Sequence, residues 1–186
     1  MNDMFLNMTT AWTVTGLRNW NTSSVSDMTR MFFNCDWTPD VEDWVTSSVR
    51  DAPSMFECKS LVGRDEPAGP DGGGHEPQRE ARGACNPDVS RWDTRALENA
   101  ERMFRNLVQF NRDLSRWDTR RLRRASYMFV NARSFDADLS NWDMTSVRGA
   151  ADVTRMFDGC PIPDSHKPRV TERGGEESRF GELKFV

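Results

Sequence analysis

Large apolar side chains recur along the chain with a period of about 25 residues. One series consists of tryptophans separated by 24, 48, 25 and 25 positions, namely Trp20, Trp44, Trp92, Trp117 and Trp142. The interval of 48 corresponds to one unit plus an insertion of about 23 residues. A second series consists of the Met-Phe pairs Met4-Phe5, Met31-Phe32, Met55-Phe56, Met103-Phe104, Met128-Phe129 and Met156-Phe157. Self-similarity at a fixed period indicates a repeat architecture, so we expect a tandem array.

Each unit divides into two halves with different hydrophobic patterns. The first half, D-L-S-x-W, alternates polar and apolar residues, as at Leu114 and Trp117, and predicts a short strand or an extended turn. The second half begins with Asp-Thr or Thr-Ser, which are favourable helix N-caps. Apolar residues follow at helical spacing, as at Leu97, Ala100 and Met103. The pattern therefore predicts one short strand and one short helix in each unit.

A single unit of this size cannot bury its apolar face alone. Stacking of units would place Trp on Trp and Met-Phe on Met-Phe in one continuous core. Each large side chain buried in this way contributes about 1.5–3 kcal/mol. The apolar pairs and tryptophans are therefore expected to be structural ladders, although a tryptophan ladder could alternatively offer an aromatic platform for sugars or bases.

The repeats divide the chain into four segments. Residues 1–61 hold repeats, the first of them partial, and residues 85–160 hold the others. Residues 62–84 are rich in Gly, Pro and charge, so we expect them to be disordered. This insertion is either a functional loop or an artefact of gene prediction. Residues 161–186 carry no repeat, contain three prolines near their start, and are expected to form a poorly ordered tail.

The consensus W-D-T-x-x-V-x-x-A/M-x-x-M-F-x-x-A/C-x-x-F-N-x-D-L-S resembles the repeats of the BspA-like leucine-rich-repeat proteins, whose repeat domain is also known as a mycoplasma-type domain of unknown function. The matching stretches are residues 17–61 and 86–160. The resemblance implies an α/β solenoid of the leucine-rich-repeat kind. It also implies a surface protein with an adhesion-like role, because many family members are bacterial surface proteins. The sequence as given departs from that pattern, since it shows no signal peptide, lipobox or wall anchor.

Composition and charge narrow the classes of partner. The mean hydropathy of −0.74 is low for a single globule and fits an elongated array. A net charge of −4 is too small to indicate a nucleic-acid or membrane partner, and no apolar run approaches the roughly 18 residues of a membrane span. The charge is uneven, however, with −4 in residues 1–61 and +2 in residues 88–160.

The repeated cysteines and aspartates favour structural roles. Cys35, Cys58 and Cys160 follow their Met-Phe pairs at matching positions, which indicates a buried ladder position for a small side chain. A disulfide between Cys35 and Cys58 is the alternative, and the absence of a C-x-x-C motif argues against a metal site. Two Asp ladders favour turn and cap chemistry, with Ca²⁺ between turns as the alternative: Asp88, Asp113, Asp138, and Asp93, Asp118, Asp143.

The sequence contains no recognisable catalytic motif. His75 lies in the insertion and His166 in the tail, so neither belongs to a repeat. The glycines Gly72–Gly74 have no strand before them and no Lys-Ser/Thr after them, unlike a phosphate-binding loop. We therefore expect a protein that is not an enzyme and that uses no cofactor or metal.

Exposed polar positions beside each predicted strand are the candidate ligand-facing residues, namely Arg112, Ser115, Arg116, Ser140 and Asn141. The arginines of residues 120–124 would either contact phosphate or an acidic protein, or form a solvated helix face, and Asp113, Asp118 and Glu101 weaken any positive patch. The first hypothesis is a binding module for a protein or surface ligand. The alternatives are a structural spacer or surface-coat segment, and an accessory repeat region of a larger multidomain protein.

Overall fold

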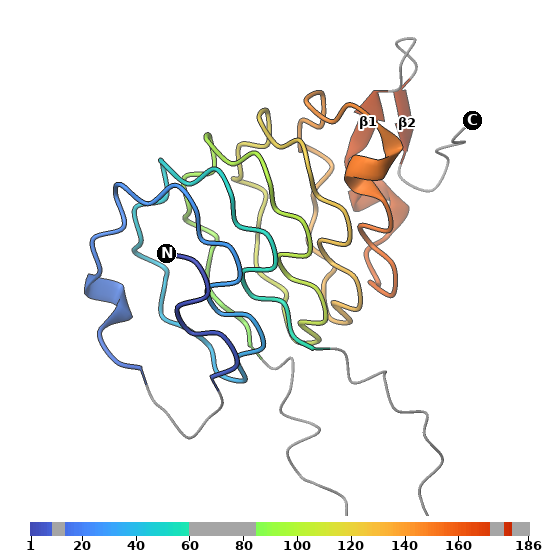
Figure 1. Ribbon diagram of the computed structural model, residues 1–186. Helices are drawn as coiled ribbons and strands as arrows, with labels where there is room; N and C mark the ends of the chain where they lie inside the picture. Colours follow the sequence, from blue (N-terminus) through green and yellow to red (C-terminus); the bar gives the residue numbers. More distant parts are fainter. Residues whose placement is uncertain (9–13, 60–84, 172–176, 180–186) are drawn as a thin grey trace, which may run out of the picture.

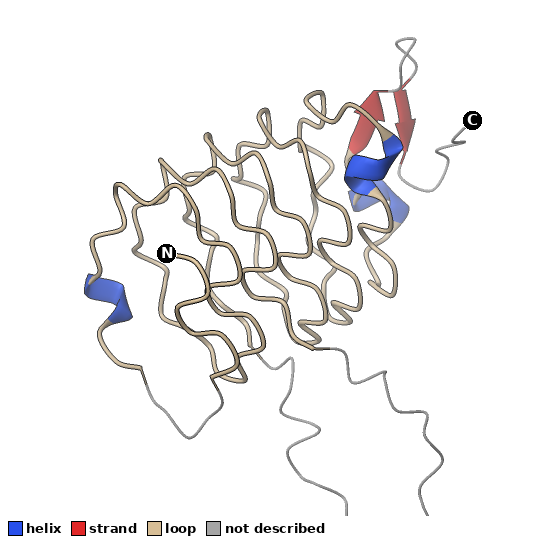
Figure 2. Ribbon diagram, in the orientation of Figure 1, coloured by secondary structure: helices blue, strands red, loops and turns tan. Residues whose placement is uncertain are grey.

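The computed structural model describes residues 1–8, 14–59, 85–171 and 177–179. Regular elements are short in these ranges (Figure 2). They comprise the 3-10 helices η1 (Leu17–Asn19), η3 (Ala150–Val153) and η4 (Asp164–His166) and the strands β1 (Arg169–Thr171) and β2 (Glu177–Arg179). The two strands pair antiparallel, with Arg169 opposite Arg179. Everything else in the described chain consists of turns and irregular segments.

Successive repeat units lie side by side in sequence order (Figure 1). We call each unit, one circuit of the chain, a coil. The Met-Phe segments of adjacent coils are joined by backbone hydrogen bonds: the N–H of Phe32 donates to the carbonyl of Met55 (2.8 Å), and the N–H of Phe104 donates to the carbonyl of Met128 (3.0 Å). Single parallel bridges join the same coils, between residues 27 and 51, 51 and 99, and 99 and 124. Neighbouring coils therefore run parallel and in register.

The short helix expected in the second half of each unit is not formed in the described residues, apart from the four-residue 3-10 helix η3 in the last unit. That segment is a series of four-residue turns, in which the N–H of Met31 donates to the carbonyl of Met28 (3.2 Å) and the N–H of Cys35 to that of Phe32 (3.3 Å). The third residue of each turn, Arg30 or Asn34, has a φ of 50° or 58°, in the left-handed region. Such residues interrupt a right-handed helix. Alternate N–H groups then bond to the next coil instead of to their own.

A column of phenylalanine rings forms the centre of the stack. Ring centroids of consecutive members lie 5.6 Å apart for Phe32 and Phe56, 6.0 Å for Phe56 and Phe104, and 5.6 Å for Phe104 and Phe129. The same column continues to Phe157, again at 5.6 Å. The preceding methionines are also buried. Equivalent side chains of successive coils therefore meet in one continuous core.

The tryptophans form a second column, in which the rings pack and the indole N–H groups donate hydrogen bonds. The rings of Trp117 and Trp142 stack with centroids 5.9 Å apart and planes at 3°. Each indole N–H donates to a carbonyl of the preceding coil, as from Trp117 to Val89 (3.0 Å) and from Trp142 to Leu114 (3.0 Å). Trp44 and Trp92 make the equivalent bonds and are equally buried, whereas Trp20 is half-buried. The rings of the four buried tryptophans are therefore not available as a platform for sugars or bases.

The repeat register continues across the insertion. The N–H of Cys58, before it, donates to the carbonyl of Arg105 (3.1 Å), after it, as equivalent residues do in other coils. The predicted disordered segment 62–84 lies outside the described residues.

The expectation for the C-terminal tail needs correction. Residues 161–171 contain η4 and β1, and Ile162 and Val170 are buried against the last coil. The N–H of Leu139 donates to the carbonyl of His166 (2.8 Å), and a parallel bridge joins Asp143 to Arg169. A segment without the repeat motif thus covers the end of the stack. Its apolar residues pack on core side chains that the last coil would otherwise expose to water.

Candidate binding groove

The Asp ladders build the corners of the coils. The carboxylate of Asp113 accepts a hydrogen bond from the backbone N–H of Ser115 (2.9 Å), and that of Asp143 accepts one from the N–H of Thr145 (2.9 Å). Carboxylates that bond the backbone two residues ahead form Asx turns. The aspartates therefore act in turns, as one interpretation of the sequence expected, but they cap no helix.

Hydrogen bonding keeps these corner carboxylates ionised. The side-chain hydrogen bond from Arg120 lowers the pKa of Asp118 to about 2, and the bond from Arg95 lowers the pKa of Asp93. The hydroxyl and N–H of Thr145 lower the pKa of Asp143. Each of these donors belongs to the same coil as its carboxylate. Within the described ranges, no group of three or more His, Cys, Asp or Glu is placed to hold a metal ion, so the Ca²⁺ alternative gains no support.

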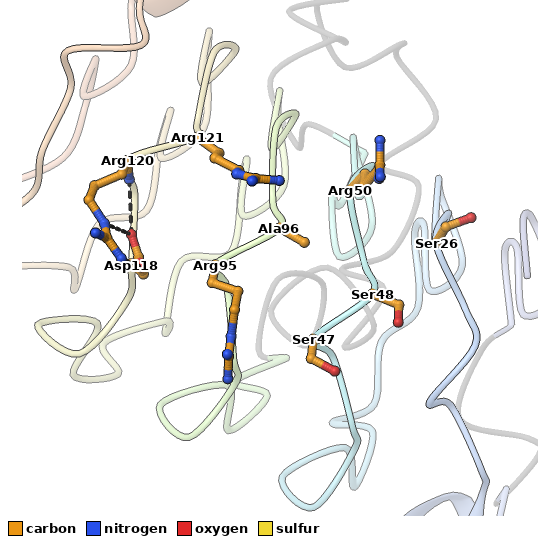
Figure 3. Close-up of a pocket in the computed structure, with 9 residues that line it drawn as sticks. All are labelled: Ser26, Ser47, Ser48, Arg50, Arg95, Ala96, Asp118, Arg120 and Arg121. Atoms are coloured by element: carbon orange, nitrogen blue, oxygen red, sulfur yellow. Dashed lines mark hydrogen bonds and ion pairs between the residues drawn. The ribbon is translucent and has the colours of Figure 1, made fainter.

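An open groove of about 720 Å³ crosses the coils on the side that follows the tryptophan ladder (Figure 3). The residues that line it come between one and six positions after a ladder tryptophan, from four coils: Ser26, Ser47, Ser48, Arg50, Arg95, Ala96, Asp118, Arg120 and Arg121. Ala96 is the small residue between longer side chains. The equivalent places in the neighbouring coils hold Ser48 and Arg121, so Ala96 has the smallest side chain of the three.

The guanidinium groups of the groove differ in how they are held. Arg95 and Arg120 each pair with the aspartate two residues earlier, with the Nε of Arg120 2.9 Å from Asp118. Arg50 is only loosely paired, at 4.0 Å from Glu98. No carboxylate of the described chain forms an ion pair with Arg121. The groove therefore contains two fixed and two weakly engaged guanidinium groups.

The structure places the predicted ligand-facing residues on another corner, just before the tryptophans, and none of them lines the groove. Arg112 is half-buried and donates to the carbonyl of Asn86 (3.0 Å), and Asn141 donates to the carbonyl of Ser115 (2.7 Å). Arg116 and Ser140 are exposed. Part of this predicted surface is thus already used in contacts between coils.

The interpretation of residues 120–124 as a solvated helix face is wrong in its geometry, because the segment is not helical. Arg120 binds Asp118, Arg123 lies 3.3 Å from Glu98, and Arg121 lines the groove. The acidic neighbours named from sequence act elsewhere: Asp113 closes its own turn and Glu101 lies 3.5 Å from Arg102. Asp118 therefore pairs with Arg120 and Glu98 with Arg123.

The cysteines pack inside the stack. Cys35 has a free thiol that donates to the carbonyl of Phe5 (2.9 Å), so no disulfide joins it to Cys58. Burial raises the pKa of Cys35 to about 12 and that of Cys160 to about 11. Cys58 lies one position earlier in its coil than Cys35 and Cys160 do in theirs. Its N–H bonds to the next coil at the place where the N–H of Asn106 does so. Sequence reasoning therefore misplaced Cys58 by one residue.

A second arginine cluster surrounds Tyr127, the single tyrosine of the chain. The guanidinium carbons of Arg102, Arg105 and Arg155 lie 5.3, 5.9 and 5.9 Å from the ring centroid. Each of these arginines also has a carboxylate partner, in Glu101, Glu57 and Asp158 respectively. This cluster is therefore balanced in charge, unlike the groove.

Comparison with known proteins gives a family and nothing finer. No curated protein matches the chain, and no solved structure matches it. Among the described residues, no helix is long and apolar enough to cross a bilayer. The family described as "Mycoplasma protein of unknown function, DUF285" matches residues 1–65 and 79–166, which include every repeat and leave out part of the insertion. The chain therefore belongs to the DUF285 family of mycoplasma-type proteins of unknown function.

Proposed function

We propose that this protein is a non-enzymatic repeat scaffold that binds a protein or surface ligand through the groove, and that its stack of coils is a solenoid of the leucine-rich-repeat kind. One observation carries the proposal: ladder positions keep the same side chains and bonds, while groove positions change from coil to coil. The position three residues after the ladder tryptophan is occupied in turn by Ser23, Ser47, Arg95, Arg120 and Thr145.

The energetics of the stack support this separation of ladder positions from groove positions. The ladder hydrogen bonds and ring contacts lie inside, so they stabilise each pair of coils whatever the groove contains. Exposed groove side chains contribute little to the free energy of unfolding. Such positions are free to vary for recognition, as binding surfaces on repeat scaffolds do.

The side chains of the groove favour binding over catalysis. Among the described residues, its lining is arginine, serine, alanine and one aspartate, without the histidine or cysteine of a typical nucleophile and base pair. Ser48 donates its hydroxyl to the carbonyl of Ser23 (2.8 Å) and so is held as a structural donor. His166 lies in the tail, with Nδ1 3.0 Å from the carbonyl oxygen of Asp136.

The predicted corner remains a second surface of the same proposal. Arg116 and Ser140 are exposed there, and Asn141 adds an exposed amide whose nitrogen is bonded to the neighbouring coil. A ligand that spans several coils would reach either this corner or the groove. The two surfaces are separable by substitution because they share no residue.

A display library of random peptides, selected on the purified full chain, tests the proposal. We expect saturable binders that Ala96→Trp abolishes by filling the groove, while Arg116→Ala leaves them unchanged. Binders that are lost with Arg116→Ala and Asn141→Ala instead would move recognition to the predicted corner. A selection without any saturable binder would favour the spacer or coat alternative and overturn the proposal. Thermal melts of the variants verify that the stack is intact.

A further inference from the structure

We propose that the groove takes a short acidic segment of a partner protein, whose carboxylates are bound by Arg50 and Arg121. This inference rests on the proposed function and specifies the chemistry of its ligand. The groove is positive although the chain as a whole carries −4: its lining, as far as the structure describes the chain, contains Arg50, Arg95, Arg120 and Arg121 against the single carboxylate of Asp118.

Two of these guanidinium groups are available to a ligand. Arg95 and Arg120 are held by their own aspartates, whereas Arg50 is 4.0 Å from Glu98 and Arg121 has no ion pair with a described carboxylate. Figure 3 shows the side chain of Arg121 extended toward the coil of Ala96, with Arg50 on the coil beyond. The hollow above Ala96 thus lies between two cations.

The wall of the groove already shows how a carboxylate is held there. The guanidinium of Arg95 binds the carboxylate of Asp93 through two nitrogens, with Nε 2.8 Å from Oδ1 and a terminal nitrogen 2.5 Å from Oδ2. This planar fork matches carboxylate geometry and makes the strongest type of charge-assisted hydrogen bond. Arg50 and Arg121 offer the same fork to an incoming Asp or Glu, and Ser47 adds a hydroxyl at the rim.

Several features disfavour a long polyanion such as a nucleic acid or a sulfated glycan. No aromatic side chain of the described part of the chain lines the groove, whereas proteins that hold single-stranded nucleic acid stack its bases on aromatic rings. The Asp ladder at positions 93, 118 and 143 runs along one margin, and residues 1–61 carry −4. A long polyanion would meet those charges, while a segment of a few residues fits within the 720 Å³ of the groove.

The test uses the full chain and a fluorescent hexaglutamate peptide, with hexaglutamine as the neutral control. We expect saturable binding of hexaglutamate that weakens with salt. The double variant Arg50→Gln/Arg121→Gln should weaken this binding by at least about tenfold, since two charge-assisted contacts are lost. The double variant Arg133→Gln/Arg148→Gln, which removes two exposed arginines outside the groove and outside the predicted corner, is the charge-matched control and should leave binding unchanged.

Four outcomes overturn the inference. They are no saturable hexaglutamate binding, equal losses in the Arg50/Arg121 and Arg133/Arg148 variants, tighter binding of heparin or single-stranded DNA, and glutarate competing as strongly as the peptide, which would indicate a small dicarboxylate ligand. The failure of this inference can be distinguished from the failure of the proposed function. If library peptides without acidic residues bind, and Ala96→Trp abolishes their binding, the scaffold proposal stands and the acidic ligand is rejected.

Discussion

The coil that begins directly after the insertion differs from the later coils in one column of buried side chains. In the later coils, Phe110 lies 4.2 Å from Phe104 and Phe135 lies 4.3 Å from Phe129, between ring centroids. The same position, seven residues before the ladder tryptophan, is Cys85 next to the insertion. The backbone register is nevertheless identical on both sides. The hydrogen-bond ladder and the first phenylalanine column therefore set the register, while the second column adds local packing.

The largest expected effect is at Trp117. Trp117→Ala should lower the free energy of unfolding by about 3–5 kcal/mol, because it leaves a cavity and removes the stack with Trp142. Trp92→Ala should cost less, since Trp92 contacts Phe56 much as Trp117 contacts Phe104, at 6.1 and 5.9 Å, but stacks on no tryptophan of the described chain. Urea titrations of both variants measure the difference. A larger loss for Trp92 would show that the interrupted region is the better packed.

Substitution in the second column tests the comparison directly. Phe110→Ala should cost about 3–4 kcal/mol as a large-to-small change at a fully buried ring. Cys85→Ala should cost only about 1 kcal/mol, because a buried thiol behaves as a small apolar group. Equal costs at the two sites, in the same denaturation experiment, would contradict a thinner core beside the insertion.

Removal of residues 62–84 should leave the register in place. The deletion brings Cys58 and Cys85 to a spacing of four residues, the spacing from Asn106 to Phe110 and from Asn131 to Phe135. A shorter loop has a smaller closure entropy, so we expect a gain of about 1–2 kcal/mol. Circular dichroism melts provide the measurement. A variant that fails to fold would mean that the deleted segment itself packs on the coils.

The smallest expected effect is on acid stability. The pKa of Asp118 in the folded chain, about 2, is below its unfolded value near 3.9. Its stabilising contribution is therefore complete above the unfolded value and is lost as the pH falls toward 2. Asp118→Asn should flatten the dependence of the melting temperature on pH between about 4 and 2. An unchanged slope would mean that the bond from Arg120 does not persist in solution.

The sequence was sufficient to assign ladder positions because like side chains recur at one spacing. It could not distinguish a helix from consecutive four-residue turns, since both place residues such as Met28, Met31 and Phe32 on one face. Asn34 and Asn106 are of a residue type that tolerates a left-handed conformation, but Arg30 and Tyr127, with φ of 50° and 60°, are not. The local sequence therefore carries only part of the turn geometry.

The groove could not be predicted from the sequence of any single repeat unit. Its lining comes from four coils, and it brings Ala96 beside the coil that carries Arg121. The corresponding feature of the sequence is Ala96, four residues after its ladder tryptophan, where the other units have serine or arginine. Only the alignment of coils in space converts that difference into a hollow.

The corner between Cys58 and Cys85 shows that the chain accommodates 23 extra residues there without losing register. The equivalent corners, between Asn106 and Phe110 and between Asn131 and Phe135, have the same backbone bonding on their coil side. Each is a natural graft site, where a foreign peptide epitope or a reporter domain can be spliced in for display. The array thus offers parallel attachment points, one coil apart, on a single hydrogen-bonded stack.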